Sequence, residues 1–240
     1  GGLGTGMGLE STKSLIPVRE GLSFLDIIIR QVLCLRRERD VTLPLLLMNS
    51  FVTHAETQDA LRAYPELARG QGDLPVAFQQ HRVPKIRQDD YTPLHWPSRP
   101  ALEWCPPGHG DLYTVLCATG LLARLLERGF SYAFISNADN LGARLDPRIL
   151  RYLAERQLPF LMEVADRHAA DSKGGHLARG RAGQLLLREA AQCPPDETDD
   201  FQDIARYRYF NTNNLWLNLP ALRDRLAGTG PVLDLPLIVN

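Results

Sequence analysis

The sequence predicts an α/β fold whose sheet is mostly parallel and covered by helices on both faces. Short, wholly apolar runs, which are typical of strands buried on both faces, recur along the chain, as at residues 43–48. Between them stand segments with apolar residues at helical spacing, through the first two-thirds of the chain. Strands that alternate with helices form such sheets, and ligands bind beyond the carboxyl ends of the strands.

The predicted elements follow in chain order. Ser23 and Asp26 have the spacing of a capping box, and apolar residues then recur at helical spacing up to Arg39. Further helices are predicted at residues 53–67, 111–128 and 146–156, after the acidic loop 193–203, and from residue 220 onward. Strands are predicted at residues 43–48, 76–78, 132–136, 160–164, 185–187, 209–210 and 215–217. Residues 84–107 are rich in proline and lack a period, which predicts a long, ordered loop.

Composition excludes several classes of protein. The net charge is −1, with 44% hydrophobic and 23% charged residues, as in an ordinary globular domain. No basic surface indicates a nucleic-acid partner, and no apolar run reaches the roughly 18 residues of a membrane span. The four cysteines have no CxxC spacing, so the sequence predicts neither a disulfide framework nor a metal site of that kind, and favours the cytoplasm. The histidines at 54, 81, 95, 168 and 176 share no metal-ligand spacing and are interpreted as surface or structural residues.

The start of the chain has the composition of a phosphate-binding loop. Five glycines stand among residues 1–8, and Lys13 follows. A backbone so free of side chains lets its N–H groups approach a phosphate, and Lys13 would add a positive charge. The P-loop pattern fails because Thr12 stands where a glycine is needed, and the dinucleotide pattern fits no register. A flexible linker is the alternative interpretation.

Polar clusters follow two predicted strands. Asp139 lies just beyond the strand at 132–136, between Asn137 and Asn140, where a carboxylate can hold Mg²⁺ against phosphate oxygens. A turn closed by an Asp or Asn side chain is the alternative for this cluster. Residues 211–214 read Asn-Thr-Asn-Asn, and their amides suit sugar hydroxyls, with a β-turn as the alternative.

The third cluster precedes a predicted helix. Gly108 and Gly110 flank His109 directly before the helix expected from Asp111 onward. Free N–H groups and positive potential make such an end an anion site, to which His109 could donate. A tight turn with a surface histidine is the alternative. Together the clusters indicate phosphate, metal and polyol chemistry.

In these segments, taken in order, the chain resembles the UDP-glucose pyrophosphorylases (UTP–glucose-1-phosphate uridylyltransferases). The segments that carry the resemblance are residues 1–15, 47–51, 78–84, 106–111, 136–143, 162–164, 171–175 and 210–216. The resemblance implies a Rossmann-like nucleotidyltransferase core of the glycosyltransferase-A type, with a mixed sheet between helices. It also implies transfer of UMP from UTP to glucose 1-phosphate, with Mg²⁺ as cofactor and pyrophosphate as the second product.

The resemblance also implies roles for individual residues. The catalytic residues would be Lys13, His109 and Asp139, with Asp139 holding Mg²⁺. The nucleotide would be bound by Gly1, Gly2, Lys13, Gln80 and Gly108. The sugar phosphate would be bound by His109, Asn137, Gly175, Glu189, Asn211 and Asn213. The sugar phosphate would attack the α-phosphorus of UTP in line, so no protein nucleophile is needed.

The chain departs from the family pattern in two places. Residues 9–12 lack the Gly-Pro and the second basic residue that many members carry before the Lys13 position. Members also have a catalytic lysine well downstream of the Asn-Thr-Asn-Asn motif. We therefore expect residues 1–240 to be one nucleotidyltransferase domain truncated at both ends, without its first strand and its C-terminal domain.

Two other functions stay open at this point. A UDP-N-acetylhexosamine pyrophosphorylase has the same chemistry, but relatives of that kind tend to have Asn at the position of His109. A uridine-nucleotide-binding module without catalysis is the alternative from another class. The sequence leaves the oligomeric state open.

Overall fold

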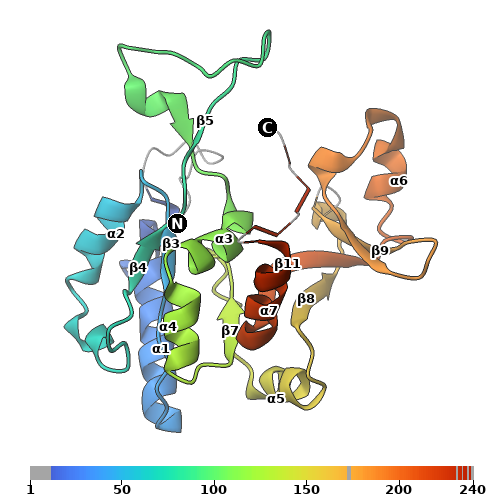
Figure 1. Ribbon diagram of the computed structural model, residues 1–240. Helices are drawn as coiled ribbons and strands as arrows, with labels where there is room; N and C mark the ends of the chain where they lie inside the picture. The colour runs from blue at the N-terminus through green and yellow to red at the C-terminus, as the bar shows by residue number, and fades with distance from the viewer. Residues whose placement is uncertain (1–11, 172–173, 231, 234, 237, 239–240) are drawn as a thin grey trace. The chain divides into compact units, whose positions relative to one another are not determined.

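The computed structural model describes residues 12–171, 174–230, 232–233, 235–236 and 238 (Figure 1). These residues form two compact units. The first holds the described residues up to Gly129, Ala138–Gly142 and those of Arg225–Leu233, which include the second half of the last helix. The second holds Phe130–Asn137, the described residues of Ala143–Asp224 and those after residue 233. The predicted nucleotide residues Gly1 and Gly2, with the rest of the glycine-rich stretch, lie outside the described residues.

A parallel pair of strands lies at the centre of the first unit. In this pair, Leu47 of β3 (Leu47–Asn49) lies opposite Ala77 of β4 (Ala77–Gln79). The other elements of the unit are β1 (Pro17–Arg19), β2 (Leu22–Ser23), α1 (Phe24–Arg39), α2 (His54–Leu61), β5 (Val83–Pro84), β6 (Trp104–Cys105), α3 (Leu112–Ala118) and α4 (Leu121–Glu127).

The predicted capping box starts α1. The Ser23 hydroxyl accepts from the N–H of Asp26 at 3.2 Å, and the N–H of Ser23 donates to the Asp26 carboxylate at 2.8 Å. The helix buries Leu25 and Ile29 against Leu67, in a core that partly buried side chains near β3 and β4 extend. This packing fixes the strand pair whose carboxyl ends lead to Ser50 and Gln80.

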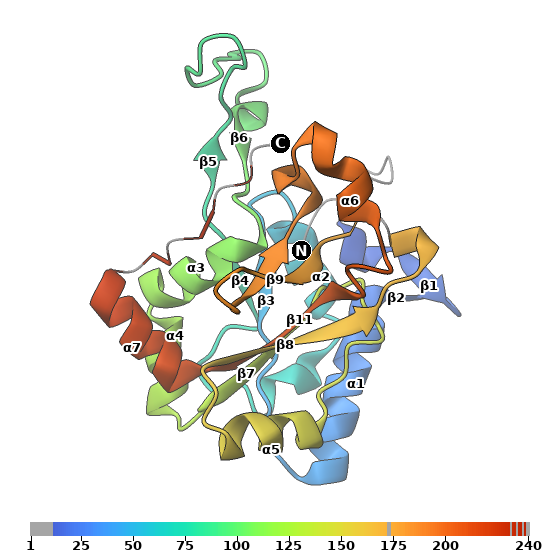
Figure 2. The ribbon, with the colours of Figure 1, turned by 90° about the vertical axis from the view of Figure 1, so that its right-hand side faces the viewer.

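Two predictions for the first unit need correction. The helix expected over residues 111–128 is two helices, α3 and α4, because Gly120 between them has φ +71° and breaks the helix. The proline-rich loop is a hairpin-like arm, in which β5 and β6 pair antiparallel, with Val83 opposite Cys105. Figure 2 shows the arm extending beyond this pair, away from the helices of the first unit.

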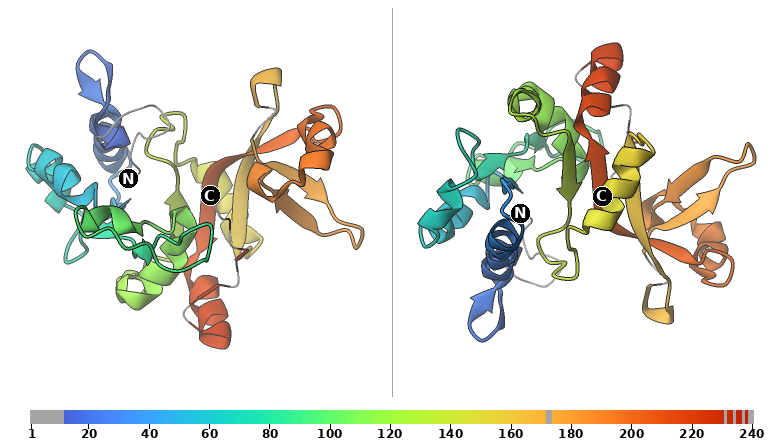
Figure 3. Two further views of the ribbon diagram at one scale, coloured as in Figure 1. Left: turned by 90° about the horizontal axis from the view of Figure 1, so that it is seen from above. Right: turned by 90° about the horizontal axis from the view of Figure 1, so that it is seen from below.

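The second unit is built on a five-stranded sheet. Its long strand β11 (Tyr209–Asn218) runs antiparallel to β7, β8 and β9. Figure 3 shows β11 between β7 and β8. The other elements are β7 (Tyr132–Ile135), α5 (Pro147–Glu155), β8 (Phe160–Asp166), β9 (His176–Arg179), β10 (Leu185–Arg188) and α6 (Thr198–Gln202), and α7 (Leu219–Thr229) follows β11.

The α/β class is confirmed, but the mostly parallel pairing is not. Within the residues that the structure describes, β3 and β4 form the parallel ladder, and the ladders of β11 are antiparallel. The reason is the connection after β8, where the chain forms the β9–β10 hairpin and then returns as β11. Parallel neighbours would need a crossover connection instead. In the same part of the chain, no helix is long and apolar enough to cross a membrane.

Candidate functional site

In the first unit, the end of β4 meets the loop before α3. The N–H of Gln80 donates to the carbonyl of Asn49 at 2.8 Å, which continues the pairing of the two strands beyond their ends. The side-chain oxygen of Gln80 accepts from the N–H of Gly108 at 3.2 Å. Gly108 has φ +102° and ψ −177°, a conformation essentially restricted to glycine. The structure thus brings together Gln80 and Gly108, two of the residues predicted to bind the nucleotide.

Asp111 does not cap the helix that follows it. Its carboxylate accepts from the N–H of His81 at 2.7 Å and lies 2.9 Å from Nδ1 of the same residue. His109 is exposed and begins a short 3₁₀ helix (His109–Asp111) directly after Gly108. The loop with the predicted phosphate contact is therefore tied to the segment after β4.

Lys13 and Asp139 form an ion pair in the first unit. Lys13 begins a short 3₁₀ helix (Lys13–Leu15), and its predecessor Thr12 donates from both N–H and hydroxyl to Glu56 of α2. These hydrogen bonds from Thr12 hold the pKa of the Glu56 carboxyl below its usual range. Glu56 thus anchors the segment that presents Lys13, a role that the sequence pattern did not reveal.

Asp139 fits the requirements of a cation site. It already pairs with the Lys13 ammonium, and the two side chains are 37% and 30% exposed, within reach of a ligand. Among the described residues, no three His, Cys, Asp or Glu side chains gather as a metal site. Mg²⁺ bound with substrate phosphates takes only one or two protein carboxylates, so a single Asp139 matches that donor set.

In the second unit, β11 carries a bulge at the predicted sugar-binding amides. Asn211 lies opposite Val164 and Asn214 opposite Glu163, so two residues of β11 are extra. One of them, Asn213, has φ +57°, a left-handed conformation that Asn tolerates. The prediction of two separate extended segments is therefore corrected to one strand with an irregular centre.

The bulge joins three of the predicted residues into one chain of amides. The N–H of Asn213 donates to the side-chain oxygen of Asn211 at 2.8 Å. The side-chain nitrogen of Asn213 donates to the side-chain oxygen of Asn137 at 2.7 Å. Because each amide fixes the next, the three present their remaining donors and acceptors in a set geometry.

Gly175 and Glu189 complete this cluster. The carbonyl of Gly175 accepts from the N–H of Asn211 at 3.0 Å. A Cβ added at Gly175 would lie 2.5 Å from Oε2 of Glu189, so the carboxylate covers the glycine backbone directly. All five predicted sugar residues of the second unit thus fall into one neighbourhood.

Glu163 is a residue of this cluster for which the sequence assigned no role. Its carboxylate accepts from Nε1 of Trp216 at 2.6 Å, and its carbonyl accepts from the Thr212 hydroxyl at 2.8 Å. The Thr212 contact holds β8 to the bulge of β11, and the Trp216 contact holds it to the regular strand just beyond the bulge. A charged residue within the otherwise apolar strand predicted at 160–164 was the available signal.

His176 is structural, which is one of the two roles that the sequence left open for it. It is buried and stacks on Tyr207, with ring centroids 4.1 Å apart. Burial lowers its pKa to about 4, and the nearby charges of Arg167 and Arg188 act in the same direction.

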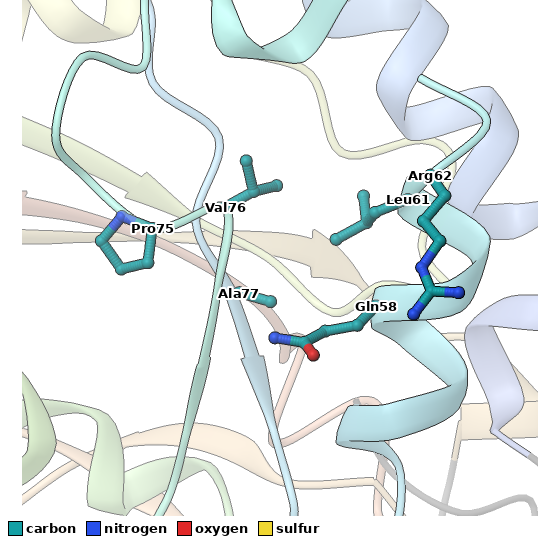
Figure 4. A pocket seen from close by; sticks show the side chains of 6 residues that line it. All are labelled: Gln58, Leu61, Arg62, Pro75, Val76 and Ala77. Atoms are coloured by element: carbon teal, nitrogen blue, oxygen red, sulfur yellow. The ribbon is translucent and has the colours of Figure 1, made fainter. Parts of the chain in front are cut away.

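A hollow of about 470 Å³ lies in the first unit between α2 and the chain leading into β4. Figure 4 shows Gln58 and Leu61 of α2 on one side and Val76 and Ala77 on the other. None of the predicted site residues that the structure describes lines this hollow.

The comparisons with known proteins decide the family. The family model of UTP–glucose-1-phosphate uridylyltransferase matches residues 1–240. The chain belongs to this family. The probable UTP–glucose-1-phosphate uridylyltransferase of Schizosaccharomyces pombe is 41% identical over 224 residues, which are 93% of this chain and 43% of that protein. The uridylyltransferase of Saccharomyces cerevisiae is 40% identical, covering 100% of this chain and 47% of that protein.

Solved uridylyltransferase structures agree with this assignment. The UDP-glucose phosphorylase of Trypanosoma brucei matches with a TM-score of 0.93 at 50% identity, over 100% of this chain and 52% of that chain. A mutant UDP-glucose pyrophosphorylase of Leishmania major, in complex with UDP-glucose, matches with a TM-score of 0.91 at 46% identity, over 100% of this chain and 52% of that chain. The chain thus spans about half the length of the relatives it matches.

Proposed function

We propose that the chain carries the substrate-binding groups of an enzyme that transfers UMP from UTP to glucose 1-phosphate, giving UDP-glucose and pyrophosphate. The observation that carries this proposal is the pairing of Lys13 with Asp139. The reaction needs a cation and a metal-binding carboxylate that both reach the phosphates of UTP. Lys13 and Asp139 are far apart in the sequence, yet they lie in contact. Membership in the uridylyltransferase family supports the reaction.

The nucleotide is assigned to the first unit. Uracil presents alternating acceptors and a donor along one edge, and the Gln80 amide with the Gly108 backbone can match such an edge. Their mutual hydrogen bond of 3.2 Å orients both before the base arrives. Lys13 neutralises charge on the phosphates. Gly1 and Gly2, which lie outside the described residues, are proposed to bind the uracil end of the nucleotide.

The sugar phosphate is assigned chiefly to the second unit. The amides of Asn137, Asn211 and Asn213 can donate to and accept from glucose hydroxyls, and the Glu189 carboxylate can accept from two of them. Gly175 leaves the space that this carboxylate occupies. From the first unit, His109 would donate to the phosphate group.

Mg²⁺ is the proposed cofactor, and Asp139 would hold it. When bound, it supplies positive charge to the crowded phosphates. The chain's own residues bind and orient the two substrates for in-line attack at the α-phosphorus, so catalysis depends on positioning and on charge. The finer fold, a Rossmann-like core of the glycosyltransferase-A type, is proposed with it. Because all four cysteines are free, the cytoplasm is the proposed compartment.

Pyrophosphate release tests the function directly. The protein at its native length is given UTP and Mg²⁺ with either glucose 1-phosphate or N-acetylglucosamine 1-phosphate. Release with glucose 1-phosphate supports the proposal. Release with the N-acetylated sugar alone would replace it by a UDP-N-acetylhexosamine pyrophosphorylase. UDP-glucose binding without release would indicate a non-catalytic module.

His109→Ala should raise the KM for glucose 1-phosphate about tenfold and leave the KM for UTP within about twofold, because one hydrogen bond to a charged phosphate is lost. Initial rates with one substrate varied and the other saturating give both constants. His95→Ala is the matched control, since His95 is a similarly exposed histidine on the arm beyond β5. An equal rise of both constants would place His109 elsewhere.

A further inference from the structure

We propose that Asp111 is a positioning residue that joins the segment Gln80–His81 to the loop Gly108–His109. In this role Asp111 fixes the relative positions of Gln80, which is proposed to bind uracil, and His109, which is proposed to bind the sugar phosphate. The inference rests on the proposed function for what these groups bind. The tie itself rests on contacts within the first unit alone.

The Asp111 carboxylate contacts both the backbone and the ring of His81. Its Oδ2 accepts from the N–H of His81 at 2.7 Å, and Nδ1 of the His81 ring lies 2.9 Å from Oδ1 and 3.1 Å from Oδ2. The Asp111 side chain is 8% exposed and the His81 side chain 48% exposed. A carboxylate this well covered needs donors, and His81 supplies them from both backbone and ring.

Asp111 does not play the role that an aspartate directly before a helix usually has. An acidic residue directly before a helix normally caps its first N–H groups, yet the Asp111 side chain makes no cap bond to α3. The N–H of Asp111 instead bonds to the carbonyl of Gly108 at 3.2 Å, which folds the loop back as a 3₁₀ turn. The side chain is thereby free to reach the other segment.

Apart from the contacts of Asp111, few described contacts join the segment Gln80–His81 to the loop Gly108–His109. The pairing of β5 with β6 holds the far end, where Val83 lies opposite Cys105. Near the site, the bond between Gln80 and Gly108 is a single neutral contact of 3.2 Å. The charge-assisted contacts of Asp111 are therefore the strongest link beside the two proposed ligand-contacting residues.

The test compares Asp111→Ala with Asp111→Asn and His81→Ala in the protein at its native length. Asp111→Ala should raise the KM for both UTP and glucose 1-phosphate about tenfold and leave kcat within about threefold, because Lys13 and Asp139 keep their own pairing. Asp111→Asn keeps one oxygen for the His81 N–H, and His81→Ala keeps the backbone bond, so both should show smaller rises. Asp73→Ala, which removes a carboxylate paired with Arg124 in the same unit, is the matched control.

Amide hydrogen exchange gives a readout that does not depend on activity. Asp111→Ala should speed exchange of the His81 amide at least about tenfold, with the Asp73→Ala protein unchanged there. Unchanged exchange, or faster exchange with unchanged KM values, would overturn the proposal. If Asp111→Ala fails to fold, the same two readouts on Asp111→Asn and His81→Ala decide. A wild-type protein without pyrophosphate release would sink the proposed function instead, and UDP-glucose calorimetry would then take the place of KM.

Discussion

Asp139→Asn should lower kcat for UDP-glucose formation by about 10²-fold or more. The substitution keeps the shape of the side chain and removes the charge that pairs with Lys13 and that would hold Mg²⁺. Electrostatic groups aimed at the reacting centre are commonly worth that much. Steady-state pyrophosphate release at saturating substrates and over a range of Mg²⁺ concentrations measures the effect.

A charge control and a titration sharpen this experiment. Asp59→Asn removes an exposed carboxylate of α2 that pairs with Arg62, and it should keep wild-type turnover. If Asp139→Asn turned over at a near-normal rate once Mg²⁺ was saturating, Asp139 would not be the metal carboxylate. Unchanged thermal unfolding of both variants would confirm that the difference lies in the chemistry.

Gly175→Ala should weaken UDP-glucose binding by about 10- to 100-fold. The new methyl carbon would stand 2.5 Å from the Glu189 carboxylate, so that side chain must leave its place over the glycine. The loss of a hydrogen bond that a sugar hydroxyl donates to the charged carboxylate accounts for a change of this size. Isothermal calorimetry with UDP-glucose measures it, and the KM for glucose 1-phosphate should rise in parallel.

The neighbouring glycine provides the control. A Cβ at Gly174 would meet its nearest atoms at 3.4 and 3.5 Å, which is ordinary or slightly tight contact. Gly174→Ala should therefore bind UDP-glucose within about threefold of wild type. Equal weakening by both substitutions would mean that the backbone of this loop matters, and the placement of Glu189 does not.

Local signals predicted the parts of the fold that depend on neighbouring residues. The start of α1 follows from Ser23 and Asp26, which cap each other within one turn. The break between α3 and α4 was predictable in principle from Gly120, which interrupts an otherwise helical pattern. The strand β11 was divided in the prediction because Asn211 to Asn214 look like a turn locally, whereas pairing with β8 extends the strand through them.

In the candidate site too, features encoded by neighbouring residues were predicted and those that depend on distant residues were not. Residue types and motifs predicted the amides Asn211 and Asn213, and the structure gathers them with Asn137. The residues that hold the site together, Glu56 and Asp111, escaped prediction. Each acts on a segment distant in the chain, Thr12 and His81 respectively, and no local pattern encodes such a partner. Glu56 lies in the first turn of α2 and Asp111 directly before α3, where an acidic residue is ordinarily explained as part of a helix cap.

Under the proposed function, the ion pair between Lys13 and Asp139 also bears on how the binding of metal and the binding of nucleotide are coupled. In the free protein each charge is satisfied by the other. A nucleotide without metal would draw Lys13 away and leave Asp139 unpaired beside its phosphates, and a metal ion without nucleotide would leave Lys13 unpaired. A metal–nucleotide complex offers both residues a new partner in a single exchange. With the roles proposed for Lys13 and Asp139, we therefore expect metal and nucleotide to strengthen each other's binding reciprocally.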